Sequence, residues 1–574
     1  MPANFAKNLA SEKIDANAIA SPYLSTKERK SEFRPLLRSQ IDPPDLPSQR
    51  PIPEQNLLLP SPSDLLDLQL LTPEDRNNTD IPGTIIVKRF EVRGSTIFSP
   101  EDFAELTKNY INRPIFFREL LHVRSLINEE YEKRDYITSG AFIPQQEITN
   151  GTIIIQVIEG EIEAINITGA RRLNPEYIRS RLGLFVRKPL NIKRLQEGLY
   201  LLQRDPLIAS LASELSAGTR TGQNILDVVV KETKTFNYSI LLNNNRSPVV
   251  GSFRRGIGAT EANLFGWGDR ISLFYNNTDG SNSIDLSYSM PYSPTNGNFR
   301  YSYGNNSSQI IDPDFAVFQV ESDSEYHEFN LRQPLYQTLA EELAIGLIYS
   351  YQSTQSRIGL FDLPLSSRGT DINGSTRVSA LRFFQEWTKR NSDAVFSVRS
   401  QFSLGTNWFN PTDNDTLPDS AFFSWRGQVQ WIKRIEPDIL FILRGDIQFS
   451  DRPLLALEQF GIGGQKSVRG YGQDLIVADN GIFASAEARI PIFRVSDGVL
   501  QIAPFIDFGM GWNNDNIEID PNALTSVGMG LRWQQGNNLT IRLDWGIPLT
   551  NLNASGNTLQ ENGIYFSILY NLFP

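Results

Sequence analysis

From residue 236 to the end of the chain, apolar and polar residues alternate with a period of two, which is typical of β-strands. In one such segment Phe423, Trp425, Val429 and Trp431 share a face, and Ser424, Arg426, Gln428 and Gln430 share the other. This part of the chain has room for about 16 strands of roughly ten residues each. We expect Asn-, Gly- and Ser-rich pieces between these segments to supply the turns.

The alternation fits two folds. A soluble sandwich would bury the apolar face, whereas a transmembrane barrel turns it to lipid and turns its charged face to a wet lumen. Charges of both signs recur on the polar face of many segments, and the chain ends on an alternating strand, Ile564–Leu572, like the terminal strand of outer-membrane barrels. Both observations favour the barrel. The charged positions are Arg399, Arg426, Arg444, Glu487, Arg489, Arg532 and Asp544.

Residues 84–235 contain an internal repeat. Gly94 and Pro100 recur with the same spacing as Gly169 and Pro175, and each proline follows a helix-capping residue, Ser99 or Asn174. A second amphipathic helix and two short strands follow in each copy, so the order β-α-α-β-β occurs twice, in 84–160 and 161–235. Units of this length and order resemble POTRA domains, which are periplasmic modules that bind extended chains. The alternative is a pair of spacer domains without a ligand.

Residues 1–80 are polar and rich in proline, which indicates an extended linker, preceded by a short helix around Asn4–Ile19. A disordered tail fits the same composition. The first residues lack the apolar core of a signal peptide, so we expect the start to be a processed or misassigned one. The sequence has no run of apolar residues long enough for a spanning helix, which leaves a closed barrel as the route across a bilayer.

Composition excludes several kinds of chemistry. The chain has no cysteine, two histidines and a net charge of −11, so we expect no disulfide, no metal site and no nucleic-acid partner. Gly461–Ser467 resembles a P-loop but lacks the glycine directly before its lysine, so we expect no nucleotide. We therefore predict neither a cofactor nor an enzymatic activity.

One cation stands out in the glycine-rich run Gln459–Tyr471, namely Arg469, between Val468 and Gly470. Further along, Asp507 is the single carboxylate in the apolar strand Phe505–Gly509 and needs water or a cation beside it. We predict that Arg469 pairs with Asp507 as a bidentate latch that holds a loop against the barrel wall. The alternative is a structural ion pair without a role in transport.

The same segments resemble the two-partner secretion transporters of the haemolysin-activator and filamentous-haemagglutinin-transporter type. The matching pieces are Asp451–Gly464, Ser467–Tyr471, Asp479–Gly481, Glu487 and Phe505–Gly509. The resemblance implies a 16-stranded outer-membrane barrel, two periplasmic POTRA domains, and a loop in the lumen with Val468, Arg469, Gly470 and Tyr471 at its tip. It also implies barrel-wall positions at Glu487, Phe505 and Gly509, and an amino-terminal helix that plugs the pore.

The partner implied by the resemblance is one cognate exoprotein, large and β-helical, exported as an unfolded chain through a barrel embedded in outer-membrane lipid. We expect the POTRA domains to capture it by edge pairing near Phe117, Leu120 and Leu121, although residues in such a pattern are commonly core. Two other functions stay open: an insertase that assembles other barrels and a general porin. The pair of POTRA domains and the Asp451–Gly464 segment argue against the insertase, and the POTRA repeat and the inward-folding loop motif argue against the porin.

Overall fold

The computed structural model describes residues 46–51, 53, 66–68 and 83–572, apart from 314, 366, 437, 516 and 552–557. Contacts divide the chain into two units, one formed mainly by residues 60–233 and the other mainly by residues 234–574. The helix predicted around Asn4–Ile19 lies outside the described residues.

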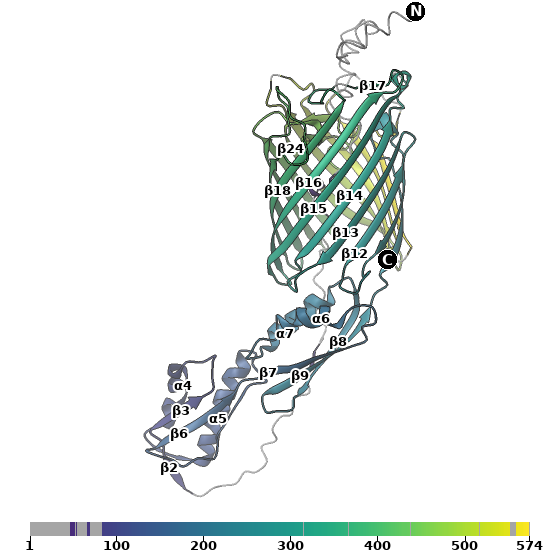
Figure 1. Ribbon diagram of the computed structural model, residues 1–574. Helices are drawn as coiled ribbons and strands as arrows, with labels where there is room; N and C mark the ends of the chain where they lie inside the picture. Colours follow the sequence, from purple (N-terminus) through teal and green to yellow (C-terminus); the bar gives the residue numbers. More distant parts are fainter. Residues whose placement is uncertain are drawn as a thin grey trace, which may run out of the picture. The chain divides into compact units, whose positions relative to one another are not determined.

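The first α/β domain has the predicted β-α-α-β-β order (Figure 1). Its sheet has the order β3-β6-β5, and α5 packs its apolar face, Leu120, Val123, Ile127 and Tyr131, into the core. Helix α4 begins at a capping box in which Ser99 and Asp102 each accept from the other's backbone N–H. The elements are β3 (Arg89–Arg93), α4 (Pro100–Thr107), α5 (Phe117–Lys133), β5 (Gly140–Phe142) and β6 (Thr152–Ile158), with a small ladder of β2 (Thr84–Ile86) and β4 (Pro114–Phe116).

The second α/β domain repeats this order and adds one strand. Asn174 caps α6 and Asn191 caps α7, and both side chains accept a backbone N–H. The sheet order is β1-β8-β9-β7. None of the helices among the described residues is long and apolar enough to cross a membrane. The elements are β1 (Leu66–Leu68), β7 (Glu161–Thr168), α6 (Pro175–Gly183), α7 (Ile192–Gln203), β8 (Ile208–Ala217) and β9 (Gln223–Glu232).

Within the part of the chain that the structure describes, sixteen long strands form a closed antiparallel barrel, which confirms the predicted fold (Figure 1). Strand β10 closes the barrel on β28 through five paired positions, Ser239–Asn243 against Ser567–Asn571. The strands are β10 (Phe236–Asn243), β11 (Arg254–Glu261), β12 (Arg270–Asn277), β13 (Ser281–Pro291), β14 (Asn298–Gln309), β15 (Val320–Gln337), β16 (Glu341–Ile358), β18 (Ser375–Arg390), β19 (Ala394–Gly405), β20 (Phe423–Glu436), β21 (Ile439–Ser450), β24 (Asn480–Arg494), β25 (Gly498–Trp512), β26 (Ala523–Gln535), β27 (Leu539–Pro548) and β28 (Ile564–Asn571), with the two-residue β17 (Leu363–Pro364) beside β16.

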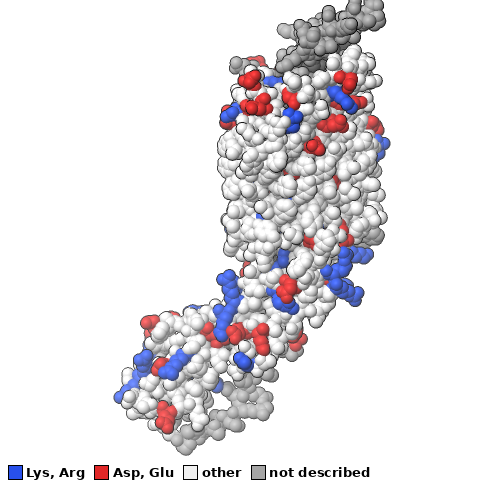
Figure 2. Space-filling view, viewed as in Figure 1, with Lys and Arg blue, Asp and Glu red and all other residues white. Residues whose placement is uncertain are grey.

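The two faces of the barrel wall differ as the alternation predicts. On β27, Trp545 points outward and is 56% exposed, while its neighbour Asp544 points inward and is fully buried. Figure 2 shows that the middle of the visible barrel wall carries few charged side chains, whereas charges gather toward both ends. Inside, charges pair across neighbouring strands, for example Arg426 with Asp446 at 2.7 Å. An apolar outer band around an ion-paired interior is the pattern of a transmembrane barrel.

Two segments lie inside the barrel. The chain between β21 and β24 folds inward as a hairpin of β22 (Phe460–Ile462) and β23 (Ile476–Ala478), which packs an apolar cluster against the wall at Phe483 and Leu524. The second segment is Leu46–Arg50, whose Ser48 N–H donates to the inward-facing Glu328 carboxylate at 3.1 Å. Part of the proline-rich linker is therefore held in the lumen.

Candidate functional site

The inward-folded loop owes its shape to glycines. Gly463, Gly464 and Gly470 have φ values of +120°, +93° and +100°, which residues with a Cβ rarely adopt. The Ser467 hydroxyl donates to the Gly463 carbonyl and accepts from the Gly463 N–H, both at 2.9 Å, which closes a compact turn. The turn presents Arg469 toward the inner face of β25.

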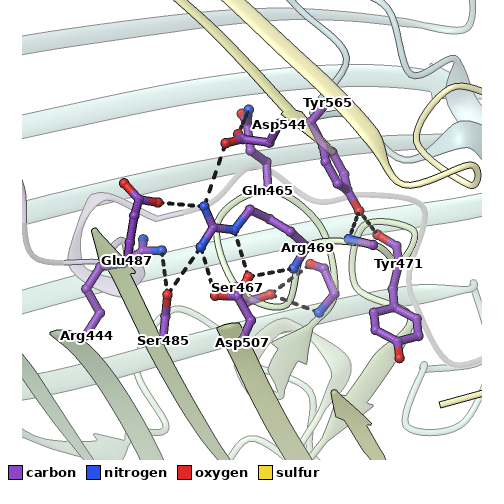
Figure 3. Close-up of polar contacts among 12 residues, drawn as sticks. Arg444, Gln465, Ser467, Arg469, Tyr471, Ser485, Glu487, Asp507, Asp544 and Tyr565 are labelled. Atoms are coloured by element: carbon purple, nitrogen blue, oxygen red, sulfur yellow. Dashed lines mark hydrogen bonds and ion pairs between the residues drawn. The ribbon is translucent and has the colours of Figure 1, made fainter. Parts of the chain in front are cut away.

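Arg469 is bound to Asp507 through three hydrogen bonds (Figure 3). Its Nε donates to Oδ2 at 2.7 Å, its Nη2 donates to Oδ1 at 2.9 Å, and its backbone N–H donates to Oδ2 at 3.1 Å. Two side-chain bonds from the planar guanidinium fix the orientation as well as the distance. The backbone bond adds a second link that does not depend on the side chain.

Three alternate residues of β25 face the loop, and each meets it differently. Phe505 lies under the guanidinium, with its ring centroid 3.4 Å from the Arg469 Cζ, in a cation–π contact. Asp507 supplies the carboxylate. At Gly509 an added Cβ would lie 2.5 Å from Ile462 Cγ2 and 2.8 Å from Val468 Cγ2, so only glycine leaves room for the loop. The spacing Phe-x-Asp-x-Gly is thus the inward face of one strand.

The residues after Arg469 bind two further strands of the barrel wall, β26 and β28. Gly470 N–H donates to the Tyr565 hydroxyl at 2.9 Å, and that hydroxyl donates to the Tyr471 carbonyl. The Tyr471 hydroxyl donates to the Thr525 carbonyl at 2.6 Å. Tyr471 is also part of the buried apolar cluster. The loop tip is therefore attached to β25, β26 and β28 together.

The Arg469–Asp507 pair is dry. We expected a latch in a water-filled channel, but both residues are fully buried because the loop and the wall pack closely around them. Removing one partner of a buried pair leaves the other charge buried without a counter-charge and costs about 3–5 kcal/mol, far more than at an exposed pair. Removing either partner is therefore more costly here than it would be in a wet lumen.

The neighbouring acids have other cations beside Arg469. Glu487 accepts from Arg469 Nη1 at 2.7 Å and also pairs with Arg489 and Arg532, each at 2.9 Å. Asp544 lies 3.7 Å from Arg469 Nη1 and pairs with Arg542 as well. Within the described residues, Asp507 forms an ion pair with Arg469 alone. Loss of Arg469 would consequently leave the buried Asp507 carboxylate without a counter-charge, whereas Glu487 and Asp544 would keep theirs.

Sequence reasoning missed a second buried ion pair, Arg382 with Glu458, at the base of the same loop. Arg382 Nη2 donates to Glu458 Oε1 at 2.7 Å and Nη1 donates to Oε2 at 3.0 Å. Glu458 also accepts from Gln352 at 3.3 Å and from the linker residue Gln49 at 3.3 Å. The signal that could have found it is the same as for Asp507, a lone carboxylate within an apolar run.

The three candidate POTRA residues lie on α5 of the first α/β domain. Leu120 is only 4% exposed and belongs to the core, which favours the packing alternative, and its place in a binding groove stays a prediction. Phe117 is half-buried and packs on the same core, and Leu121 is half-buried. Helical spacing alone does not separate a groove from a core.

Among the described residues, no group of three or more His, Cys, Asp or Glu side chains could hold a metal ion.

Comparison with known proteins agrees with this architecture. The family described as haemolysin secretion/activation protein ShlB/FhaC/HecB matches residues 222–533, and the ShlB-type POTRA domain matches residues 85–160. The heme/hemopexin transporter protein HuxB of Haemophilus influenzae is 23% identical over 79% of this chain and 81% of its own length. The outer membrane transporter CdiB of Dickeya dadantii is 23% identical over 68% of this chain and 69% of its own length.

Solved structures show the same fold. CdiB from Escherichia coli superposes with a TM-score of 0.66 at 20% identity, over 88% of this chain and 93% of its own. BamA from Haemophilus ducreyi, without its POTRA domains 1–3, superposes with a TM-score of 0.53 at 13% identity, over 85% of this chain and 100% of the BamA chain.

A closed sixteen-stranded barrel with POTRA domains, whose relatives are named as transporters, defines an outer-membrane transporter of two-partner secretion. The chain belongs to the haemolysin secretion/activation protein family, ShlB/FhaC/HecB. Its barrel lies in the outer membrane and its POTRA domains lie in the periplasm.

Proposed function

We propose that this transporter exports one cognate exoprotein, a large β-helical protein that crosses the barrel as an unfolded chain and is captured first by the POTRA domains. The protein performs no catalysis and binds no nucleotide, nucleic acid or cofactor. The observation that carries the proposal is the loop held inside the barrel by Arg469 and Asp507.

The loop acts as a latched plug. Its apolar cluster and the Leu46–Arg50 segment occupy the lumen. An exported chain can therefore pass only if the loop and this segment move aside or leave room beside them. Fully buried contacts hold the Arg469 end of the loop, while the base is held through Glu458 and Arg382. A loop fixed at two places has a defined resting position from which it can be released.

The test compares export by Arg469→Ala and Asp507→Asn variants with export by Arg357→Ala. Arg357 pairs with Glu321 at 3.0 Å, but this pair is largely exposed and should contribute less than about 1 kcal/mol. The cognate exoprotein is defined as the protein that disappears from the medium when the gene for this chain is deleted. We expect both latch variants to assemble in the outer membrane and to secrete at least tenfold less of it, with Arg357→Ala unchanged.

Normal secretion from both assembled latch variants would remove the latch from the mechanism. An Arg469→Lys variant adds a graded readout because lysine keeps the charge but cannot form the bidentate pair. Deletion of the gene separates the proposal from an insertase: loss of one exoprotein supports export, whereas depletion of many unrelated barrels from the outer membrane supports barrel assembly.

A further inference from the structure

A cavity of about 210 Å³ lies inside the barrel, between the inward-folded loop and the inner face of β20 and β21. On the loop side it is lined by Phe460, Lys466 and Ser467, and on the wall side by Arg426 and Arg444. At roughly 30 Å³ for each molecule, the cavity has room for about seven waters. It can therefore hold a small ion with part of its water, but not a lipid or a length of unfolded polypeptide.

Arg444, on the inner face of β21, has no carboxylate partner among the described residues. Its Nη2 donates to the Ser485 hydroxyl at 3.4 Å, and its Cζ lies 5.7 Å from the centre of the Phe483 ring. The same hydroxyl accepts from Arg469 Nη2 at 3.4 Å, so two guanidinium groups share one oxygen (Figure 3). A cation held beside a second cation, away from bulk water, is costly unless an anion approaches it.

The carboxylates around Arg444 pair with other arginines. Asp446, on the same strand, forms two hydrogen bonds with Arg426, at 2.9 and 2.7 Å. The three acids beyond Ser485 all pair with Arg469, and they are Glu487, Asp507 and Asp544. Of the charged residues in the described lining of the cavity, four are cationic and two are acidic: Arg50, Arg426, Arg444 and Lys466 against Asp446 and Asp474. The cavity therefore favours an anion.

Two buried amide oxygens at the cavity have no hydrogen-bond partner within the part of the chain that the structure describes. Gln430 stands opposite Arg444 in the register of β20 and β21 and is 5% exposed, and its Oε1 accepts no hydrogen bond. The Oε1 of Gln473, on the loop, is likewise unpaired. An amide oxygen needs a donor, whereas arginine supplies donors to anionic oxygens. A ligand that satisfies both kinds of group carries anionic oxygens and an O–H group.

We propose that this cavity is a binding site for hydrogen phosphate, with Arg444 on its anionic oxygens and an amide oxygen, that of Gln430 or Gln473, on its O–H group. The guanidinium presents a planar pair of N–H donors that matches phosphate. The bound ion contacts the loop as well as the wall because both line the cavity. It therefore helps to hold the loop in its resting position, in addition to the latch between Arg469 and Asp507.

The test compares thermal unfolding of the full-length protein in sodium phosphate and in sodium chloride of matched ionic strength, followed as the loss of the folded barrel band on a gel. Phosphate should raise the unfolding temperature by about 2–4 °C and then saturate, whereas chloride should not. Arg444→Gln should abolish this rise. In chloride this variant should unfold no earlier than the unmodified protein, because it removes a charge that has no counter-charge.

The matched control is Arg399→Gln. Arg399 is another lumenal arginine, but it pairs with Glu386 at 3.3 Å and does not line the cavity. The response of this variant to phosphate should be that of the unmodified protein. A second variant, Gln430→Leu, removes an acceptor without changing any charge. It should raise the phosphate concentration for a half-maximal rise by about 2- to 10-fold.

Electrical recording in planar bilayers tests whether the ion holds the loop. Phosphate should make open events rarer in the unmodified protein and leave their frequency unchanged in Arg444→Gln. Equal unfolding temperatures of the unmodified protein in the two salts, or a full response to phosphate in Arg444→Gln, overturn the site. A rise in unfolding temperature without fewer open events overturns its role in holding the loop. None of these measurements needs the exoprotein, so they are independent of the proposed export function.

Discussion

Gly546 offers a way to disturb the latch without touching a charge. This glycine lies on the inward face of β27, and a Cβ added there would be 2.5 Å from Gly470 N and 2.7 Å from the Arg469 carbonyl carbon. These are backbone atoms, so no side-chain rotation relieves the clash. Reaching an ordinary contact of 3.4 Å requires the loop to retreat by about 0.9 Å.

A retreat of this size weakens the latch. A shift of about 0.9 Å taken along the Arg469–Asp507 bonds of 2.7 and 2.9 Å would lengthen them to about 3.6–3.8 Å, beyond hydrogen-bond range. Overpacking costs about 1–3 kcal/mol, less than the about 3–5 kcal/mol that breaking a buried pair costs, so part of the population keeps the latched loop. Gly546→Ala should therefore shift the equilibrium toward the released loop by about 5- to 150-fold.

Single-channel recording in planar bilayers measures this shift as more frequent open events, and secretion of the exoprotein should fall in parallel. The control is Gly445→Ala, where the nearest atom to an added Cβ is Val429 Cγ1 at 3.0 Å, on an exposed side chain that can move. If Gly546→Ala gave the same channel records and secretion as Gly445→Ala, close backbone contact would not hold the loop, and the reasoning would be refuted.

Three further outcomes follow from the same structure. Glu458→Gln should lower the stability of the folded barrel by about 3–5 kcal/mol because it leaves the buried Arg382 without its counter-charge, whereas Glu321→Gln should cost less than about 1 kcal/mol. The measurement is the temperature at which the band of the folded barrel disappears on a gel. Equal shifts of this temperature in the two variants would contradict the prediction. Burial raises the pKa of Tyr131, so its stabilisation of the first POTRA domain is present below the unfolded pKa of about 10 and is lost as pH rises above it. The urea midpoint of this domain in the full chain should fall above pH of about 10, less steeply in Tyr131→Phe, and parallel curves would rule this out. Trp545→Arg on the lipid face should cost up to about 2–4 kcal/mol and reduce the assembled fraction, and an undiminished fraction would mean that this face does not meet lipid.

The pattern of residues predicted the architecture because both period-two alternation and capped, repeated helices are local signals. Trp545 and Asp544 show this for the barrel, as do Ser99 and Asn174 for the α/β domains. The pairing of Arg469 with Asp507 was also predictable because each is an isolated charge in its segment.

What the sequence could not supply depends on tertiary partners. The dryness of Arg469 arises from packing of the loop on the wall, which no local pattern encodes. The pair Arg382–Glu458 joins segments far apart in the chain. Leu66–Leu68 becomes a strand only because β8 provides an edge, and a proline-rich composition otherwise indicates a linker. Leu120 had a helical pattern that fits a groove and a core equally.

The short ladder between β10 and β28 bears on how the barrel matures. These strands stand at opposite ends of the barrel sequence, so bringing them together carries the largest loop-closure cost and comes late in folding. Tyr565, on β28, is the residue whose hydroxyl joins Gly470 to Tyr471. The loop tip is thus attached to the last strand of the barrel, so the plug gains this hold only when β28 has paired with β27.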